Sequence, residues 1–292
     1  MALTLAEAQK LSTDVLQAGV IETIARESAV LSMLPFMEIE GNAYSYNVEK
    51  ALPTVAFREV NEAYTANEAQ FETRSENLVI LGGDVELDRF IIQTLANVND
   101  QVAVQIAEKA KAVSNTYTKT FFHGKKATNP KEFDGLDVRV AGTAQEITAV
   151  NTDDQSILDS LNALMDAVRG GADAIFMSKK ARRKMLSIMQ KSNHYLEQGA
   201  DAFGRPVTIY AGVPIMAVEE EILPATENLT DVYAVKFGPY THVSGLQNGG
   251  VQVRRLGETS AKAVEVTRIE WFCGLAMFNP YSVAKLKGLS VA

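Results

Sequence analysis

The chain has 292 residues, of which 47% are hydrophobic and 22% are charged, with a formal net charge of -8 at pH 7. This ordinary globular composition excludes disorder of the whole chain and predicts a core in one or two domains. The acidic balance argues against free-standing nucleic-acid binding, because such binding depends on basic residues that neutralise phosphates. Cys273 is the only cysteine, so no disulfide within the chain is expected, and the chain suits a reducing compartment such as the cytoplasm.

The sequence predicts neither a membrane span nor a secretory signal. A helix that crosses a bilayer needs about 20 apolar residues, whereas the longest apolar run, from Trp271 to Phe278, has 8. Near the N-terminus, Glu7, Lys10 and Asp14 interrupt the stretch where a signal peptide needs continuous apolar residues. We therefore expect no membrane partner.

The first 34 residues predict a helical arm with one apolar face. Apolar residues recur at roughly helical spacing from Leu5 to Leu34, and Pro35 follows them. Residues 41–49 then alternate apolar and polar side chains, which is typical of a half-exposed strand, and Pro53 interrupts the pattern. A hairpin is therefore expected after the arm.

The middle of the chain predicts a poorly apolar segment, a strand and a long helix. Residues 58–77 contain three large apolar residues among five glutamates, so this segment cannot form a core of its own. Residues 78–90 are interpreted as a strand around Gly82 and Gly83, a pair expected to form a bulge or turn. Apolar residues at steps of three or four then predict one amphipathic helix from Leu95 to Phe122.

The second half predicts a mixed body. A helix is expected from Asp154 to Val168, followed by a turn at Gly170-Gly171 and a strand over 172–177. Ser178 is expected to cap a third helix. After these helices, short segments with strand patterning continue to the C-terminus. The fold class is therefore α+β.

No catalytic, cofactor-binding or metal-binding site is predicted. His123, His194 and His242 are far apart and match no metal-ligand spacing. The sequence has no nucleophile elbow, phosphate loop or dinucleotide-binding glycine motif. Cys273 lies in an apolar run, where a buried inert thiol is the better interpretation. We therefore expect a protein that is not an enzyme and needs no cofactor.

Two charged runs have both a structural and a functional interpretation. The acidic run from Glu219 to Glu221 could bind a cation, but a solvated edge or an inter-subunit partner for arginines such as Arg254 and Arg255 explains it better. The basic run from Lys179 to Lys184 could face packaged nucleic acid, but the solvated face of an amphipathic helix explains it better.

The arm and the poorly apolar segment together indicate an assembly protein. Ordering a residue costs about 1 to 2 kcal/mol and needs buried surface in return. Neither segment has enough apolar surface of its own, so neighbouring subunits are expected to supply it. The expected inter-subunit contacts are Leu11, Val15, Ile24, Tyr44, Tyr46, Tyr64, Phe71, Glu72 and Arg74.

The C-terminal segment carries a motif that supports a family resemblance. It contains Arg268-Ile-Glu270, then Ala276, then a turn sequence around Pro280, with Gly288 near the end. This motif and the order of the elements resemble the major capsid proteins of tailed bacteriophages of the Hong Kong 97 type. In that family a long strand carries the Arg-x-Glu pair, and a turn that contains proline follows it. The motif covers about twenty residues, whereas the likeness in architecture covers nearly the whole chain.

The resemblance implies how the chain is divided. Residues 1–37 would form an N-terminal arm, and residues 38–83 an extended loop that lies across an adjacent subunit. Residues 84–139 and 256–292 would form a peripheral domain with a spine helix over 95–122. Residues 140–255 would form an axial domain that gathers around five-fold and six-fold axes.

The resemblance also implies a function and partners. Copies of the chain would form pentamers and hexamers of an icosahedral shell around the double-stranded DNA of a tailed phage, assembled in the cytoplasm of the bacterial host and found in the virion capsid. A portal and a decoration protein are further expected partners. Because the chain starts directly at the arm, a separate scaffolding protein is expected. Lys50, near the loop base, is the only lysine between Lys10 and Lys109, so we expect no covalent crosslink at the loop tip.

Two alternatives stay open. Encapsulin nanocompartments resemble phage capsids in fold but enclose enzymes, so copurified double-stranded DNA would favour a phage capsid and a copurified cargo enzyme would favour a compartment. A soluble α+β enzyme has the acidic residues as its support, and their geometry is not given by the sequence.

Overall fold

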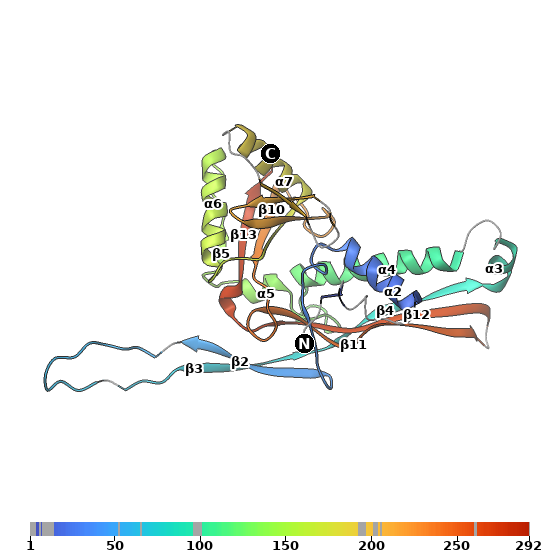
Figure 1. Ribbon diagram of the computed structural model, residues 1–292, viewed down its shortest axis with the longest axis horizontal. Coiled ribbons are helices and arrows are strands. Elements are labelled where there is room, and N and C mark those ends of the chain that lie inside the picture. Colours follow the sequence, from blue (N-terminus) through green and yellow to red (C-terminus); the bar gives the residue numbers. More distant parts are fainter. Residues whose placement is uncertain are drawn as a thin grey trace.

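The chain folds into two sheets, helices that pack on them, and a hairpin that extends beyond the rest of the molecule (Figure 1). The computed structural model describes residues 4, 5, 7, 15–51, 53–64, 66–95, 101–191, 197–200, 204, 206–259 and 262–291. The predicted α+β class is confirmed. Of the helices in these described ranges, none is both long and apolar enough to cross a bilayer.

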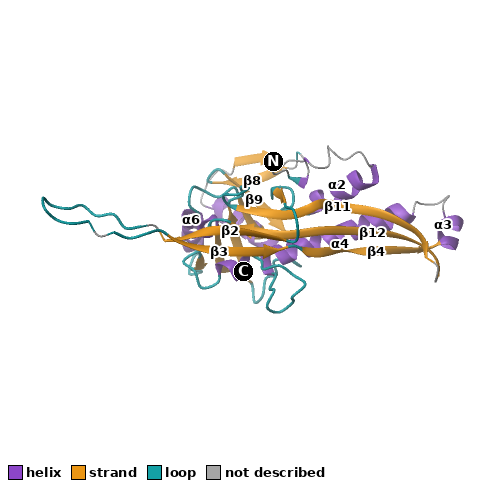
Figure 2. Ribbon diagram, turned by 90° about the horizontal axis from the view of Figure 1, so that it is seen from below, coloured by secondary structure: helices purple, strands orange, loops and turns teal. Residues whose placement is uncertain are grey.

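The first sheet, named here the long sheet, joins four strands of the described residues. Strand β11 (Val243–Thr259) pairs antiparallel with β12 (Lys262–Met277), which pairs antiparallel with β4 (Val79–Asp88). Strand β1 (Phe36–Glu38) adds to the other edge, parallel to β11. Both views show the long sheet extending well past the body of the molecule (Figures 1 and 2).

Helix α4 (Gln101–His123) runs along the long sheet (Figure 1). Its buried apolar residues recur at steps of three or four, which keeps one face of the helix toward the sheet. The rings of Tyr117 and Trp271 stack with centroids 4.8 Å apart at the centre of this contact. Helix α2 (Val15–Glu27) packs beside α4. The buried residues of the α4 face include Ile106, Ala110, Val113, Tyr117 and Phe121.

The second sheet, named here the body sheet, has the strand order β5-β13-β10-β6-β9-β8-β7 among the described residues. Its central strand β6 (Ala174–Ser178) is buried on both faces. Phe176 packs in the same core as α4, whereas Ile175 packs in the core under α6 and α7. This burial explains why the segment has a continuous apolar sequence. The other elements are β5 (Glu146–Thr148), β13 (Val283–Ser290), β10 (Leu229–Val235), β9 (Val213–Val218), β8 (Pro206–Tyr210), β7 (Glu197–Ala200), α6 (Asp154–Ala167) and α7 (Lys179–Lys191).

The starts of the two body helices agree with the sequence. Helix α6 begins at Asp154, as predicted, and the preceding Asp153 accepts a hydrogen bond from the Ser156 amide at 2.9 Å. Ser178 caps α7, as predicted, because its hydroxyl oxygen accepts a hydrogen bond from the Ala181 amide at 3.2 Å.

The glycine pairs differ from one another. Gly170 and Gly171 have φ angles of +80° and +84°, so they form the predicted turn after α6. The prediction for Gly82 and Gly83 was wrong, because both lie inside β4, which pairs with β12 without a shift of register. A Cβ atom at Gly82 would overlap the carbonyl oxygen of Ile269. Gly82 is therefore needed for the close approach of two strands, whereas a Cβ atom at Gly83 would meet the Lys109 side chain of α4.

The structure describes two helices along the predicted spine helix over 95–122, and residues 96–100 between them lie outside the described residues. Leu95 belongs to the first helix, α3 (Arg89–Leu95), and α4 begins at Gln101. The apolar spacing continues from one helix to the next and therefore does not distinguish them. Asn99 and Asp100, which precede α4, are residue types that favour helix caps over helix interiors. The C-terminal end at His123 agrees with the prediction.

The sheets divide the chain differently from the predicted domain boundaries in two places. All of β11 belongs to the long sheet with β12, although residues up to 255 were assigned to the axial domain. Strand β13 belongs to the body sheet with β10, although residues 256–292 were assigned to the peripheral domain. Strand patterning shows that a segment is extended, but it does not show which sheet the segment joins.

Candidate assembly surface

The projecting hairpin is the feature that the rest of the chain does not cover (Figures 1 and 2). Strand β2 (Ala43–Ala51) pairs antiparallel with β3 (Gln70–Asn77), with Tyr44 opposite Glu76 and Val48 opposite Glu72. A hydrogen bond of 2.8 Å from the Leu78 amide to the Asn42 carbonyl closes the base. The expected hairpin is therefore present, and its partner strand lies about 20 residues further along the chain.

The tip of the hairpin, residues 53–69, exposes large apolar side chains. The exposed fractions are 94% for Val55, 108% for Phe57, 90% for Val60 and 69% for Tyr64. Fully burying such a side chain stabilises a protein by about 1.5 to 3 kcal/mol, and the tip gains none of this within its own chain. The apolar side chains of the tip can therefore be buried only by contact with another molecule.

The base of the hairpin, in contrast, packs on the long sheet. Tyr46 and Val48 are buried with Leu246 and Ala276. The rings of Tyr46 and Phe278 lie 4.6 Å apart, and the Tyr46 hydroxyl oxygen accepts a hydrogen bond from the Met277 amide at 3.2 Å. The base therefore has a defined position relative to the sheet.

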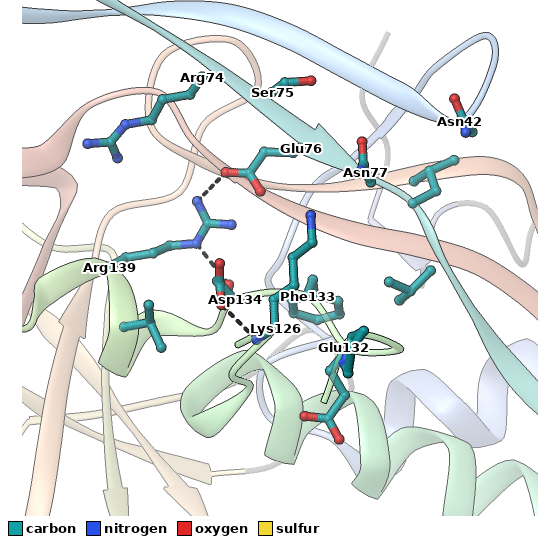
Figure 3. Close-up of a pocket in the computed structure, with 14 residues that line it drawn as sticks. Asn42, Arg74, Ser75, Glu76, Asn77, Lys126, Glu132, Phe133, Asp134 and Arg139 are labelled. Carbon is teal, nitrogen blue, oxygen red and sulfur yellow. Dashed lines mark hydrogen bonds and ion pairs between the residues drawn. The ribbon is translucent and has the colours of Figure 1, made fainter. Parts of the chain in front are cut away.

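A buried ion pair connects the hairpin to α5 (Leu136–Val140) (Figure 3). The Arg139 Nη1 atom lies 2.5 Å from Glu76 Oε1 on β3, and the exposed side-chain fractions are 5% and 16%. Arg139 also donates hydrogen bonds to the carbonyl oxygens of Asp134 at 2.9 Å and Leu275 at 3.0 Å. Burial lowers the pKa of Arg139, but the hydrogen bond and charge of Glu76 outweigh burial and raise this pKa.

A groove of about 530 Å³ lies beside this ion pair. One side is formed by residues 74–79 of the hairpin base, and the other by residues 126–139 before and within α5 (Figure 3). Lys126, Glu132 and Asp134 give the groove a mixed charge. The lining therefore favours neither a positively charged nor a negatively charged ligand.

A second buried cluster surrounds Asp137, the other charged residue of α5. The Asp137 carboxylate lies 2.6 Å from His123 Nδ1 and 2.6 Å from Lys285 Nζ, and it accepts a hydrogen bond from the Tyr233 hydroxyl at 2.7 Å. Lys285 also pairs with Asp231 at 2.8 Å. Burial alone would raise the pKa of Asp137, but these hydrogen bonds outweigh it and hold the pKa well below its usual value of 3.8.

The expected contact residues of the arm and the hairpin base fall in different environments. Leu11 lies outside the described residues, and of Val15 the structure describes only its place in α2. Ile24 and Tyr46 are buried inside the chain, so their role as inter-subunit contacts is corrected: each packs on the chain's own core. Tyr44 is half-buried and its ring stacks on that of Tyr46, with centroids 6.1 Å apart.

The remaining expected contact residues lie on or near the exposed part of the hairpin. Tyr64 and Phe71 are exposed at 69% and 66%. Glu72 and Arg74 form an ion pair of 3.7 Å on the surface of β3. These four residues are therefore available to a neighbouring molecule, and their role as contacts stays a prediction.

The C-terminal motif supports the long sheet. Arg268 and Glu270 lie on β12, and the Arg268 guanidinium binds both carboxylate oxygens of Asp84 on β4, at 2.7 and 2.8 Å. Ala276 is buried against the hairpin base. Pro280 begins the short helix η1 (Pro280–Ser282), which leads into β13. The motif therefore connects the two sheets.

The charged runs have partners within the chain. Glu219 pairs with Lys179, and Glu220 pairs with Lys180 at 2.9 Å. The acidic run therefore neutralises lysines in the first turn of α7. Its expected pairing with Arg254 and Arg255 of another subunit stays a prediction. Within the described ranges no group of three or more His, Cys, Asp or Glu side chains could hold a metal ion. Cys273 is buried, and burial raises the pKa of its thiol well above the usual value.

Sequence reasoning missed Glu76, Asp137 and Arg139 as residues of the candidate site. Their partners lie far away in the chain: Arg139 follows Glu76 by 63 positions, and Lys285 follows Asp137 by 148 positions. No local pattern marks such pairs. The alternation of Asp137 and Arg139 in a short segment resembles ordinary surface charge.

Comparisons with solved structures find similar folds among shell proteins. The holo-SrpI encapsulin complex from Synechococcus elongatus PCC 7942 matches with a TM-score of 0.72 and 18% identity, over 100% of this chain and 98% of that chain. A chain from Mycobacterium phage Bobi matches with a TM-score of 0.67 and 13% identity, over 89% and 90%. The capsid of a native GTA particle matches with a TM-score of 0.66 and 14% identity, over 89% and 90%. At these identities the likeness shows the fold.

Comparisons of the sequence identify a family. No curated protein matches the chain. Residues 12–160, just over half of the 292 residues, match the family model described as Major capsid protein GP7. This match includes α2, the projecting hairpin, α4 and the first half of α6. With the fold of Hong Kong 97-type shell proteins and this family match, the chain belongs to the major capsid protein GP7 family and is a phage major capsid protein.

Proposed function

We propose that copies of this chain form pentamers and hexamers of an icosahedral shell that encloses the double-stranded DNA of a tailed phage. The exposed apolar tip of the hairpin supports this proposal most strongly, because only a neighbouring molecule can cover it. In a shell made of one protein, that neighbour is another copy. We expect a head-to-tail contact, because the hairpin and the body lie at different places on the molecule (Figure 1), and such contacts form rings where the rotation between copies closes.

The proposed division of labour follows the predicted domains with the corrections described above. The hairpin within the predicted loop of residues 38–83 serves as the extended loop, with Tyr64, Phe71, Glu72 and Arg74 as candidate contacts. The long sheet with α4 serves as the peripheral domain. The body sheet with α6 and α7 serves as the axial domain that gathers around the symmetry axes.

The role is structural and not catalytic in this proposal. Assembly takes place in the cytoplasm of the bacterial host, with a portal, a separate scaffolding protein and a decoration protein as candidate partners. The shell is held by non-covalent contacts. Boiling purified particles in detergent should therefore release a band of monomer mass, whereas a ladder of multimers would contradict this part of the proposal.

A shell filled with a cargo protein is the second candidate. The similarity to the encapsulin complex covers the whole of this chain, and both kinds of shell share this fold. The contents of the particle separate the two. Particles isolated from cells that produce the native assembly should contain nuclease-protected double-stranded DNA. Particles with one abundant internal protein and no protected DNA would overturn the phage capsid and favour the compartment.

A further inference from the structure

Helix α5 contacts the hairpin base through Arg139 and the body sheet through Asp137. Residues two apart on an α-helix point about 200° away from each other, so Asp137 and Arg139 leave α5 on nearly opposite sides. Leu136 and Val140 are fully buried and fix the helix in the core. The helix therefore has a set position from which each charged side chain reaches a separate partner.

The Arg139 side of α5 determines where the hairpin base lies. In the part of the chain that the structure describes, Glu76 is the carboxylate that forms an ion pair with Arg139. The Tyr46 hydroxyl also donates to Glu76 Oε1 at 3.3 Å. A displacement of β3 would leave the Arg139 charge buried at 5% exposure with carbonyl partners alone. Such a displacement is therefore strongly opposed.

The Asp137 side of α5 determines where the body sheet lies. Its partners come from the end of α4 through His123, from β10 through Tyr233, and from β13 through Lys285. The second nitrogen of His123 lies 2.8 Å from the Ile222 carbonyl oxygen. Asp137 therefore joins the long helix to two strands of the body sheet.

We infer that Glu76, Asp137 and Arg139 form a joint, named here the α5 joint, that fixes the angle between the hairpin and the body and thereby sets the curvature of the shell. Glu76 and Arg139 are positioning residues for assembly. The inference rests on the proposed function, because the angle matters only if the hairpin reaches a neighbouring copy. In a head-to-tail contact, the direction in which the arm leaves the body decides whether and at what curvature rings close.

The groove beside the ion pair supports the inference. It has a volume of about 530 Å³ and is lined by Glu76, Arg139 and both of the segments that the ion pair connects. A hairpin base released from Arg139 thus has space on one side into which it can turn. Both side chains of the ion pair line this space (Figure 3).

The test compares three chains. They are the wild-type chain, the single variant Glu76→Gln, and a double variant that carries both Glu76→Gln and Arg139→Gln. The single variant leaves the Arg139 charge buried without its counterion, whereas the double variant removes both charges and avoids that cost. Glu108→Gln is the matched control, because it removes a carboxylate from an exposed ion pair with Lys111 on α4. Each full chain is assembled and its particle diameters are measured by electron microscopy.

Both Glu76 variants should give particles with a broader or shifted diameter distribution, with the fraction at the wild-type diameter reduced at least about twofold. The control should keep the wild-type distribution. Hydrogen exchange of the Leu78 amide, which closes the hairpin base, should be faster by about tenfold or more in both variants. The melting temperature should fall in the single variant and recover in the double variant, so a loss of stability alone cannot explain the altered particles.

Wild-type diameters together with unchanged Leu78 exchange in the double variant would overturn the inference. A wild-type chain that never assembles would overturn the proposed function instead, and the exchange of Leu78 would still decide whether the ion pair holds the hairpin. If Glu76→Gln alone fails to fold, the double variant still provides the comparison, because it has no unpaired buried charge.

Discussion

Asp137 joins α4 to two strands of the body sheet, and its ionisation predicts how stability varies with pH. Its pKa in the folded chain is held well below the usual value of 3.8. A depressed pKa contributes stability that is present above the unfolded pKa and is lost as pH falls below it. The melting temperature of the wild-type chain should therefore decrease as pH falls below about 4.

The variant Asp137→Asn should show a lower melting temperature at neutral pH and a smaller decrease below pH of about 4, because it has no carboxylate to protonate. Asp166→Asn, on the exposed surface of α6, is the control and should follow the wild-type curve. Thermal unfolding across pH measures both. Parallel curves for Asp137→Asn and the wild-type chain would contradict the role given to Asp137.

Burial could be predicted from the sequence at many single residues, but the buried ion pairs could not. Cys273 is buried as expected from its apolar neighbours. Ile24 and Tyr46 were correctly recognised as apolar, yet their partners turned out to belong to the same chain. Periodicity shows which face of an element is apolar, and it does not show whether that face meets its own chain or another copy.

At the scale of elements, the same glycine-to-alanine substitution should have opposite effects on the free energy of unfolding at two positions. Gly82 lies where β4 and β12 come so close that a Cβ atom would overlap backbone atoms of β12. The substitution Gly82→Ala should lower the free energy of unfolding by about 1 to 3 kcal/mol. Gly19 lies inside α2 with no atom near the position of a Cβ. Gly19→Ala should raise the free energy of unfolding by about 0.5 to 1 kcal/mol.

Chemical denaturation of the two variants provides the measurement. The pair is informative because the substitution is the same and the local geometry differs. Equal effects of both substitutions, in either direction, would show that the close approach of β4 to β12 is not a constraint.

The elements themselves were largely predictable, but their assignment to sheets was not. The starts of α6 and α7 could be predicted because each has a polar cap followed by an apolar periodicity. One helix was predicted where the structure describes α3 and α4, because the apolar spacing continues from one to the other. β11 and β13 were assigned to the wrong parts because sheet membership depends on pairing between distant segments, which a single sequence does not encode locally.

At the scale of the whole molecule, the hairpin tip predicts a separation of folding from assembly. The double variant Val55→Ser with Phe57→Ser should leave the free energy of unfolding of the monomer within about 0.5 kcal/mol of wild type, because both side chains are exposed. Assembly should need at least about tenfold higher protein concentration, because each buried side chain contributes about 1.5 to 3 kcal/mol.

Light scattering during assembly, together with denaturation of the unassembled chain, measures both quantities. Arg183→Ser, on the exposed surface of α7, is the control and should change neither. Assembly of the tip variant at the wild-type concentration would show that the tip is not buried between copies.

The sequence predicted the hairpin and its need for a partner, because the segment has too few apolar residues for a core of its own. It did not predict the direction in which the hairpin leaves the body. The inferred α5 joint assigns that direction to contacts between Tyr46, Glu76 and Arg139, which lie far apart in the sequence.

Electron microscopy of the purified full-length chain across a range of concentrations tests the central claim most directly. A subunit whose hairpin tip is covered by another copy should form closed shells of uniform diameter above a threshold concentration. A chain that remains a discrete monomer or dimer at every concentration would contradict the account.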